Sequence, residues 1–280
     1  MTRKARHLLI IDPQNDFCDL PASECDGNVP ALPVAGADAD MKRLADLIEQ
    51  GGAGIAAITV TLDSHQRLDI GHPGFWRTGD GGAVAPYTQI RAADVKAGTY
   101  RPRDAAATQR VTRYLDALEI NGRYVHMVWP VHCELGSWGH NVHAAVRRAY
   151  NRWEEATGVC VEKVLKGMNP WTEHYSAVRA EVPDPTSSDT STNDGLLKRL
   201  ALSDEILIAG EASSHCVKAT TEHIVQFRAE LARRIVLVAD CMSPVAGFES
   251  AQNSFIDAMR AKGVRVASSA EILSGLTSAG

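Results

Sequence analysis

Short apolar runs rich in β-branched residues alternate along the chain with longer amphipathic stretches. Buried strands are predicted at 7–12, 55–62, 161–165, 205–209, 235–239 and 264–267. The spacing of apolar residues predicts helices at 38–50, at about 215–232 and at 249–262. Strands that alternate with helices form βαβ units with right-handed crossovers. The pattern therefore predicts an α/β fold, with a mainly parallel sheet covered by helices on both faces.

Two stretches interrupt this alternation. Residues 66–123 contain many Gly, Arg and Ala and show no regular succession of strands and helices. Residues 183–195 are rich in Pro, Ser, Thr and Asp, a composition typical of a loop. We interpret the chain as a single domain over 1–280, with insertions at about 66–123 and 183–195. A small subdomain within the first insertion is the alternative.

Composition and charge narrow the classes of function. Lys and Arg number 29 against 34 Asp and Glu, which gives a net charge of −5 over 280 residues. Nucleic-acid-binding proteins usually carry a basic surface, so no nucleic-acid partner is expected. No apolar run approaches the ~20 residues that cross a membrane, so no membrane partner is expected either. The six cysteines form no C-x-x-C pair and follow no signal peptide, which indicates reduced thiols in a cytoplasmic protein.

Reactive side chains stand where the predicted strands end. Asp12 ends the first strand, and Asp63 and His65 follow the second. Lys166 follows the third, and Cys216 comes just after the fourth, at the start of a helix. In open α/β sheets, ligands bind beyond the carboxyl ends of the strands. We therefore expect these side chains to meet at one edge of the sheet.

Cys216 is the candidate nucleophile. A thiol at a helix N-terminus lies near the positive end of the helix dipole, which favours the reactive thiolate. A carboxylate such as Asp12 can accept the thiol proton, and an ammonium such as Lys166 stabilises both charges. A buried structural cysteine and a salt bridge at the sheet edge are the alternative explanations. Backbone N–H groups after the turn at Gly210 are candidates for binding an oxyanion.

Asp63 and His65 are candidate metal ligands, because they lie on the same side of an extended segment. Such a pair suits a divalent cation. Among the 10 histidines, His132 is the preferred third ligand, since it follows an apolar strand predicted at 124–128. His72, in a Gly/Pro loop, is its competitor, and Cys133 is a candidate soft ligand that ranks below its neighbour His132.

Five segments together resemble the isochorismatase-like cysteine hydrolases, and nicotinamidases most of all. They are LLIIDPQNDF at 8–17, TLDSH at 61–65, WPVHC at 129–133, VLKG at 164–167 with Tyr175-Ser176 downstream, and GEASSHCV at 210–217. The segments occur in the order found in that family. The resemblance implies a three-layer α/β/α, Rossmann-like fold with a six-stranded, mainly parallel sheet. It also assigns Asp12, Lys166 and Cys216 to a catalytic triad.

The same resemblance assigns further roles. It implies a cis peptide bond before Ala212 and an oxyanion hole formed by the amides of Ala212 and Cys216. It implies a divalent metal ion held by Asp63, His65 and His132, with zinc as the first candidate and iron or manganese as alternatives. The residues expected to hold a planar substrate are Phe17, Trp129 and Tyr175. Members of the family are often oligomers, so a homo-oligomer is expected.

The expected function is that of a cysteine-dependent amidohydrolase. It would convert a small planar carboxamide, nicotinamide or similar, to a carboxylate and ammonia through a thioester. The alternatives are hydrolysis of a ureido, carbamoyl or maleamate-like amide, and a catalytically silent protein that binds a small molecule or a metal. The sequence departs from the family at Ser213-Ser214, where Thr-Asp is commoner, and in the length of 66–123. Both departures fall in loops that shape the pocket, so they bear on the substrate more than on the reaction.

Overall fold

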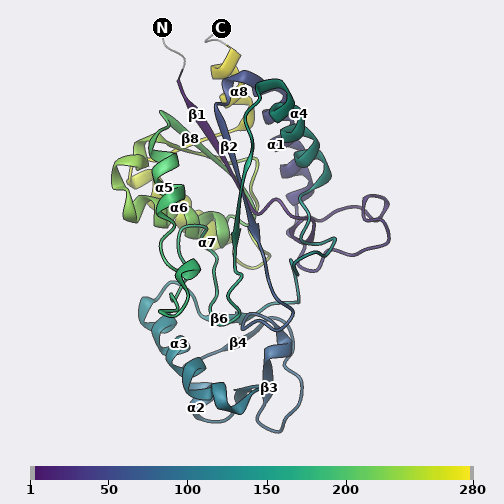
Figure 1. Cartoon of the computed structure of the whole chain (residues 1–280), viewed down its shortest axis with the longest axis vertical. Coiled ribbons are helices and arrows are strands. Elements are labelled where there is room, and N and C mark those ends of the chain that lie inside the picture. Colours follow the sequence, from purple (N-terminus) through teal and green to yellow (C-terminus); the bar gives the residue numbers. More distant parts are fainter. Residues whose placement is uncertain (1–3, 278–280) are drawn as a thin grey trace.

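A six-stranded parallel sheet forms the centre of the computed structural model, which describes residues 4–277 (Figure 1). In spatial order the strands are β10 (Arg265–Ala267), β9 (Ile235–Val238), β8 (Glu205–Gly210), β1 (Arg6–Ile11), β2 (Ala57–Asp63) and β7 (Glu162–Lys166). Every neighbouring pair is parallel. The six predicted strands and the parallel sheet are therefore confirmed, with strand ends that differ by no more than two residues.

Helices cover both faces of this sheet, so the predicted three-layer α/β/α fold is confirmed (Figure 1). One face carries α1 (Ala37–Gly51), α4 (Ala144–Thr157) and α8 (Ser269–Thr277), and the other carries α5 (Asp194–Ala201), α6 (Cys216–Phe227) and α7 (Glu249–Ala261). The alternation of β1 explains the arrangement, because Leu8 and Ile10 pack on the first face, and Leu9 and Ile11 on the second. The helix predicted at about 215–232 ends earlier, at Phe227, and a 3-10 helix continues it.

The first predicted insertion folds into a small unit, which we call the cap (residues 66–128). It contains two antiparallel pairs, β3 (Trp76–Thr78) with β5 (Tyr100–Pro102) and β4 (Thr88–Ile90) with β6 (His126–Val128), and the helices α2 (Ala92–Lys96) and α3 (Thr108–Asn121). A separate apolar cluster around Trp76, Val111 and Leu115 holds it together. The strand predicted at 124–128 is thus shortened to β6, and it pairs with β4 outside the main sheet.

The cap lies beyond the carboxyl ends of the central strands, at the lower end of the molecule in Figure 1. The second predicted insertion contacts it, since Arg110 of α3 forms an ion pair of 2.6 Å with Asp184. Short 3-10 helices occupy several loops, at Asn15–Phe17, Ala22–Glu24, Gly52–Gly54, Pro73–Phe75, Ala105–Ala107, Ser188–Thr190 and Ala229–Arg234. No helix among residues 4–277 combines the length and apolar character needed to cross a membrane.

Candidate active site and metal centre

Three of the predicted catalytic side chains meet where β1, β7 and α6 converge. Asp12 directly follows β1, Lys166 is the last residue of β7, and Cys216 is the first residue of α6. The Lys166 Nζ atom lies 2.8 Å from Asp12 Oδ2 and 3.6 Å from Cys216 Sγ. All three side chains are buried. An ammonium group therefore stands between a carboxyl group and a thiol.

The side chain of Thr61 fixes the Asp12 carboxyl group. Its hydroxyl donates a hydrogen bond of 2.6 Å to Asp12 Oδ1 and accepts one of 3.0 Å from the Asp12 amide. Thr61 lies on β2, the direct neighbour of β1 in the sheet. Parallel pairing thus brings to Asp12 a partner that is 49 residues distant in sequence.

Burial sets the protonation state of the site. It raises the pKa of the Cys216 thiol well above its usual range, although Lys166 opposes this effect. Burial also raises the pKa of Asp12. The carboxylates of Asp12 and Asp63 hold the pKa of Lys166 well above its usual range in spite of its burial. The helix terminus was expected to favour a thiolate, but in the free protein the loss of solvent is the larger effect, so the thiol is the resting form.

The turn between β8 and α6 presents two free backbone amides. Within residues 4–277, neither the N–H of Ala212 nor that of Cys216 donates a hydrogen bond. The peptide bond between Glu211 and Ala212 is cis, as the resemblance implies. Gly210 permits the turn, because its φ is 115° and a side-chain carbon there would overlap the backbone of Ile11. The two amides can therefore receive an oxyanion next to the thiol.

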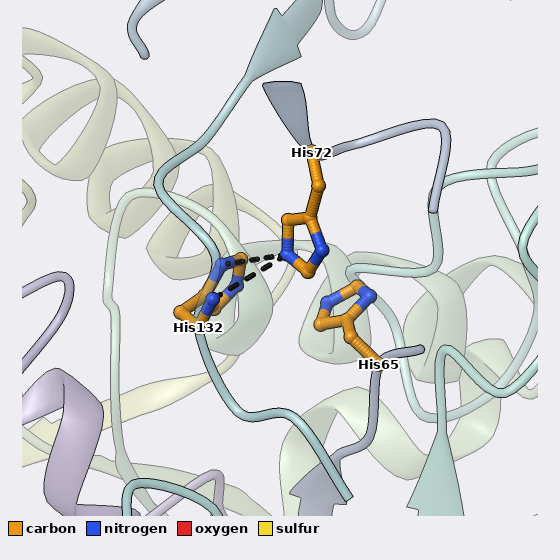
Figure 2. A group of neighbouring side chains, drawn as sticks. All are labelled: His65, His72 and His132. Carbon is orange, nitrogen blue, oxygen red and sulfur yellow. Dashed lines mark hydrogen bonds between the residues drawn. The ribbon is translucent and has the colours of Figure 1, made fainter. Parts of the chain in front are cut away.

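Three buried histidines form a cluster beside this triad (Figure 2). His65 follows β2, His72 belongs to the cap, and His132 follows β6. One ring nitrogen from each lies within 4.8 Å of the others, a spacing that suits ligands of one ion. His72 Nε2 lies 3.3 Å from His132 Nδ1. His72, which the sequence ranks only as a competitor, thus joins the predicted ligands.

Asp63 connects the histidines to the triad. Its Oδ2 atom lies 3.1 Å from His65 Nε2 and 3.4 Å from His132 Nε2, and its Oδ1 atom lies 2.9 Å from Lys166 Nζ. Asp69 binds the other ring nitrogen of His65, at 3.1 Å. Imidazoles with one carboxylate are donors that zinc and other divalent transition metals accept, and the carboxylate behind His65 is the support that such ligands usually have. The residues present therefore fit a divalent metal ion.

The protonation state of His72 suits a metal ligand. Burial and the neighbouring imidazoles lower its pKa to about 3, so the ring is neutral, as a metal ligand must be. The carboxylates of Asp63 and Asp69 hold the pKa of His65 well above its usual range, so metal binding there would release a proton. Cys133 takes no part in the histidine cluster. Its amide donates to Asp16 Oδ2 at 2.7 Å instead, and burial raises the pKa of its thiol.

A narrow pocket opens on the thiol and the histidine cluster. The predicted substrate residues Phe17, Trp129 and Tyr175 all line it, together with Cys216 and His132. Trp129 Nε1 donates to the Tyr175 hydroxyl at 3.0 Å, which fixes two of the aromatic walls. The pocket has a volume of about 20 Å³. Larger cavities of about 510 and 370 Å³ adjoin the cap, but neither contains a triad residue.

Four further lining residues were not predicted from the sequence. Leu32, Glu173, His215 and Val245 complete the pocket. Burial raises the pKa of Glu173 to about 8, and its Oε2 atom has no hydrogen-bond partner among the described residues. Glu173 comes from an irregular loop, where neither periodicity nor a strand end marks it. His215 was open to prediction, since it directly precedes the candidate nucleophile.

The fold is that of known hydrolases. The yeast nicotinamidase, also solved with the inhibitor nicotinaldehyde, is 20% identical over 93% of this chain and 98% of its own, with a TM-score of 0.62. A zinc-bound pyrazinamidase of Pyrococcus horikoshii is 16% identical (94% and 98% covered, TM-score 0.53). An isochorismatase-family protein of Desulfovibrio vulgaris is 18% identical (98% and 99% covered, TM-score 0.51). No protein-family profile and no curated protein sequence matches the chain. The chain thus has the isochorismatase-like fold, and its overall structure resembles that of nicotinamidases.

Proposed function

We propose that the protein is a cysteine-dependent amidohydrolase that cleaves a small planar carboxamide, nicotinamide or a similar compound, to a carboxylate and ammonia. The observation that carries the proposal is the Lys166 ammonium between the Asp12 carboxyl group and the Cys216 thiol. This arrangement lies beside two free amides and an aromatic pocket. A nucleophile, a base and an oxyanion site within one pocket are what acyl transfer requires.

Acylation begins with transfer of the thiol proton from Cys216 to Asp12, since both groups contact the Lys166 ammonium. Lys166 stabilises the thiolate as it forms. The sulfur then attacks the carbonyl carbon, and the amides of Ala212 and Cys216 bind the oxyanion. Asp12 returns its proton to the amide nitrogen, the C–N bond breaks, and ammonia leaves behind a thioester.

Deacylation uses the same carboxyl group. Asp12 removes a proton from a water molecule, which attacks the thioester carbonyl at the same oxyanion site. The tetrahedral intermediate collapses, the carbon–sulfur bond breaks, and Asp12 returns the proton to Cys216. The product is the carboxylic acid. The raised pKa values of Asp12 and Cys216 suit this cycle, because both groups must hold a proton in turn.

A divalent ion at His65, His72 and His132, with Asp63 beside them, would bind and orient a polar group of the substrate, such as a ring nitrogen. The pyrazinamidase with bound zinc supports the choice of zinc. The chain's own side chains carry the chemical steps, because the thiol already serves as the nucleophile. Phe17, Trp129 and Tyr175 supply flat apolar walls for a planar ring.

A panel of carboxamides tests the proposal through the ammonia released. Nicotinamide, pyrazinamide, maleamate and a carbamoyl amino acid, each incubated with the metal-loaded protein, separate the amide classes. We expect release from the two planar ring amides above the other two. No ammonia from any member of the panel would contradict the proposal and favour a binding protein.

A further inference from the structure

A second cavity adjoins the catalytic pocket. His215 and Tyr175 line both spaces, so the two spaces adjoin at these residues. The catalytic pocket, at about 20 Å³, has little more room than a water molecule needs. The second space, which we call the outer cavity, has a volume of about 250 Å³. It lies between the cap and α6, and its lining includes Gln89, Arg123, Tyr124, Lys218 and Phe248.

The charged groups that face the outer cavity are basic. Arg123 and Lys218 both line it, whereas their carboxylate partners, Glu181 and Glu222, do not. Glu222 Oε2 lies 3.2 Å from Lys218 Nζ and 3.0 Å from Arg123 Nη2, so one carboxylate outside the outer cavity pairs with both cations. Burial and the Lys218 charge lower the pKa of His215 to about 4, so its ring is neutral. A chain with a net charge of −5 thus presents two cations, each paired with a carboxylate outside the outer cavity, to a space beside the catalytic pocket.

Aromatic rings form the sides of this cavity. The Tyr124 ring stacks on His215, with centroids 5.8 Å apart and planes inclined by 21°. Phe248 contacts His215 edge-on, at 4.7 Å between centroids. Lys218 Nζ lies 4.8 Å from the centre of the Tyr124 ring. The outer cavity therefore combines flat walls with an ammonium group.

We propose that the preferred substrate is a planar ring carboxamide that also bears a carboxylate, and that this carboxylate binds in the outer cavity at Lys218 and Arg123 while the amide reaches Cys216. The inference rests on the proposed function and adds the class of substrate. Charge-assisted hydrogen bonds from an ammonium or guanidinium group to a carboxylate are among the strongest in proteins. A nicotinamide-sized molecule leaves the outer cavity without such a contact.

Matched substrates test the inference. The compounds are nicotinamide, nicotinamide with a carboxylate at ring position 5 or 6, and the methyl ester of each acid. The readout is the ratio of kcat/KM for acid to that for ester, measured by ammonia release. The proteins are the wild type, Lys218→Met, Lys218→Arg and Lys96→Met. Lys96 pairs with Asp116 on the cap, so its replacement removes the same charge away from the outer cavity.

For the better of the two acids we expect a ratio of about ten or more in the wild type. Lys218→Met should bring this acid-to-ester ratio close to one, while Lys218→Arg and Lys96→Met should keep the wild-type ratio. Higher salt should lower the wild-type ratio, a readout that needs no variant. Two outcomes overturn the inference and leave the proposed function intact. One is an equal kcat/KM for acids and esters in the wild type, and the other is an unchanged ratio in Lys218→Met. No ammonia from any of the five amides overturns the proposed function, and this inference with it.

Discussion

Loss of solvent dominates the behaviour of individual ionisable side chains in this protein. Cys216, Asp12 and Lys166 are all buried, and each is moved from its usual pKa. The lysine stays charged only because two carboxylates face it, whereas the thiol stays protonated in spite of the lysine. The position of Cys216 at a helix terminus was therefore insufficient to predict the resting charge of its thiol. In the proposed mechanism, proton transfer to Asp12 therefore occurs during the reaction.

His126 tests the effect of burial on a side-chain pKa away from the candidate active site. It lies on β6 of the cap, its Nε2 atom bonds to the carbonyl of Ile70 at 2.9 Å, and burial lowers its pKa from 6.5 to about 4. Between pH 6.5 and 4 the unfolded state binds the proton that the folded state excludes, so the stability from this group is lost as pH falls. From pH 7 to pH 5 the loss is about 2 kcal/mol.

Urea unfolding of the wild type and of His126→Gln at pH 7 and pH 5 measures this effect. Glutamine keeps a donor for Ile70 but does not titrate. We expect the wild type to lose about 2 kcal/mol more than the variant on acidification. Equal losses in the two proteins would show that His126 titrates normally in the folded state.

Among the elements, the sheet was open to prediction and the cap was not. Four strands of the central sheet, β1, β2, β8 and β9, are apolar runs buried on both faces, so local composition reveals them. The strands of the cap have three residues each and pair only with one another, so no run of sequence marks them. The helix α4 is a different case, because Val146, Ala149, Tyr150 and Trp153 have helical spacing that went unused.

The residues of the candidate site divide in the same way into those that the sequence could reveal and those that it could not. Asp12, Lys166 and Cys216 were found because they end or follow strands that lie in one sheet. His72 and Glu173 reach the site from loops, and only the packing of the cap against the sheet decides where those loops lie. A strand-end rule cannot locate such residues, since their approach depends on contacts between distant segments.

The junction between β8 and β1 gives an element-scale prediction. Gly210→Ala should destabilise the protein by at least about 3 kcal/mol, because the added carbon overlaps the backbone of Ile11 at a φ of 115°. Gly122→Ala is the control, since Gly122 also has positive φ but nothing within 4 Å of the added carbon. It should cost about 1 kcal/mol. Similar losses in denaturant unfolding would contradict the close approach of the two strands.

At the scale of the whole molecule, the histidine cluster joins parts that are separate in sequence. His65 belongs to the end of the central sheet, His72 to the cap, and His132 to the loop after β6. A bound ion would therefore connect the cap to the sheet as well as orient a substrate. Ligands that bind only the folded state stabilise it, by about 2.7 kcal/mol at a free concentration of 100 times Kd.

Chelation should accordingly lower the melting temperature, by roughly 5–10 °C for a chain of this size. His72→Asn should bind less of the metal, as measured by elemental analysis after dialysis, and should show a smaller shift with chelator. The control is His140→Asn, because His140 bonds to Ser64 at 2.9 Å and lies outside the cluster. Full metal content in His72→Asn would restrict the ligands to Asp63, His65 and His132.

The proposed function requires that the Cys216 sulfur is the nucleophile of an amidase. Its most direct test is the rate of ammonia release from nicotinamide by the wild type, Cys216→Ala and Cys160→Ala, with Cys160 as an exposed control cysteine. We expect a loss of at least about a thousandfold for Cys216→Ala and none for Cys160→Ala. Ammonia release by Cys216→Ala within about tenfold of the wild-type rate would contradict the proposed function.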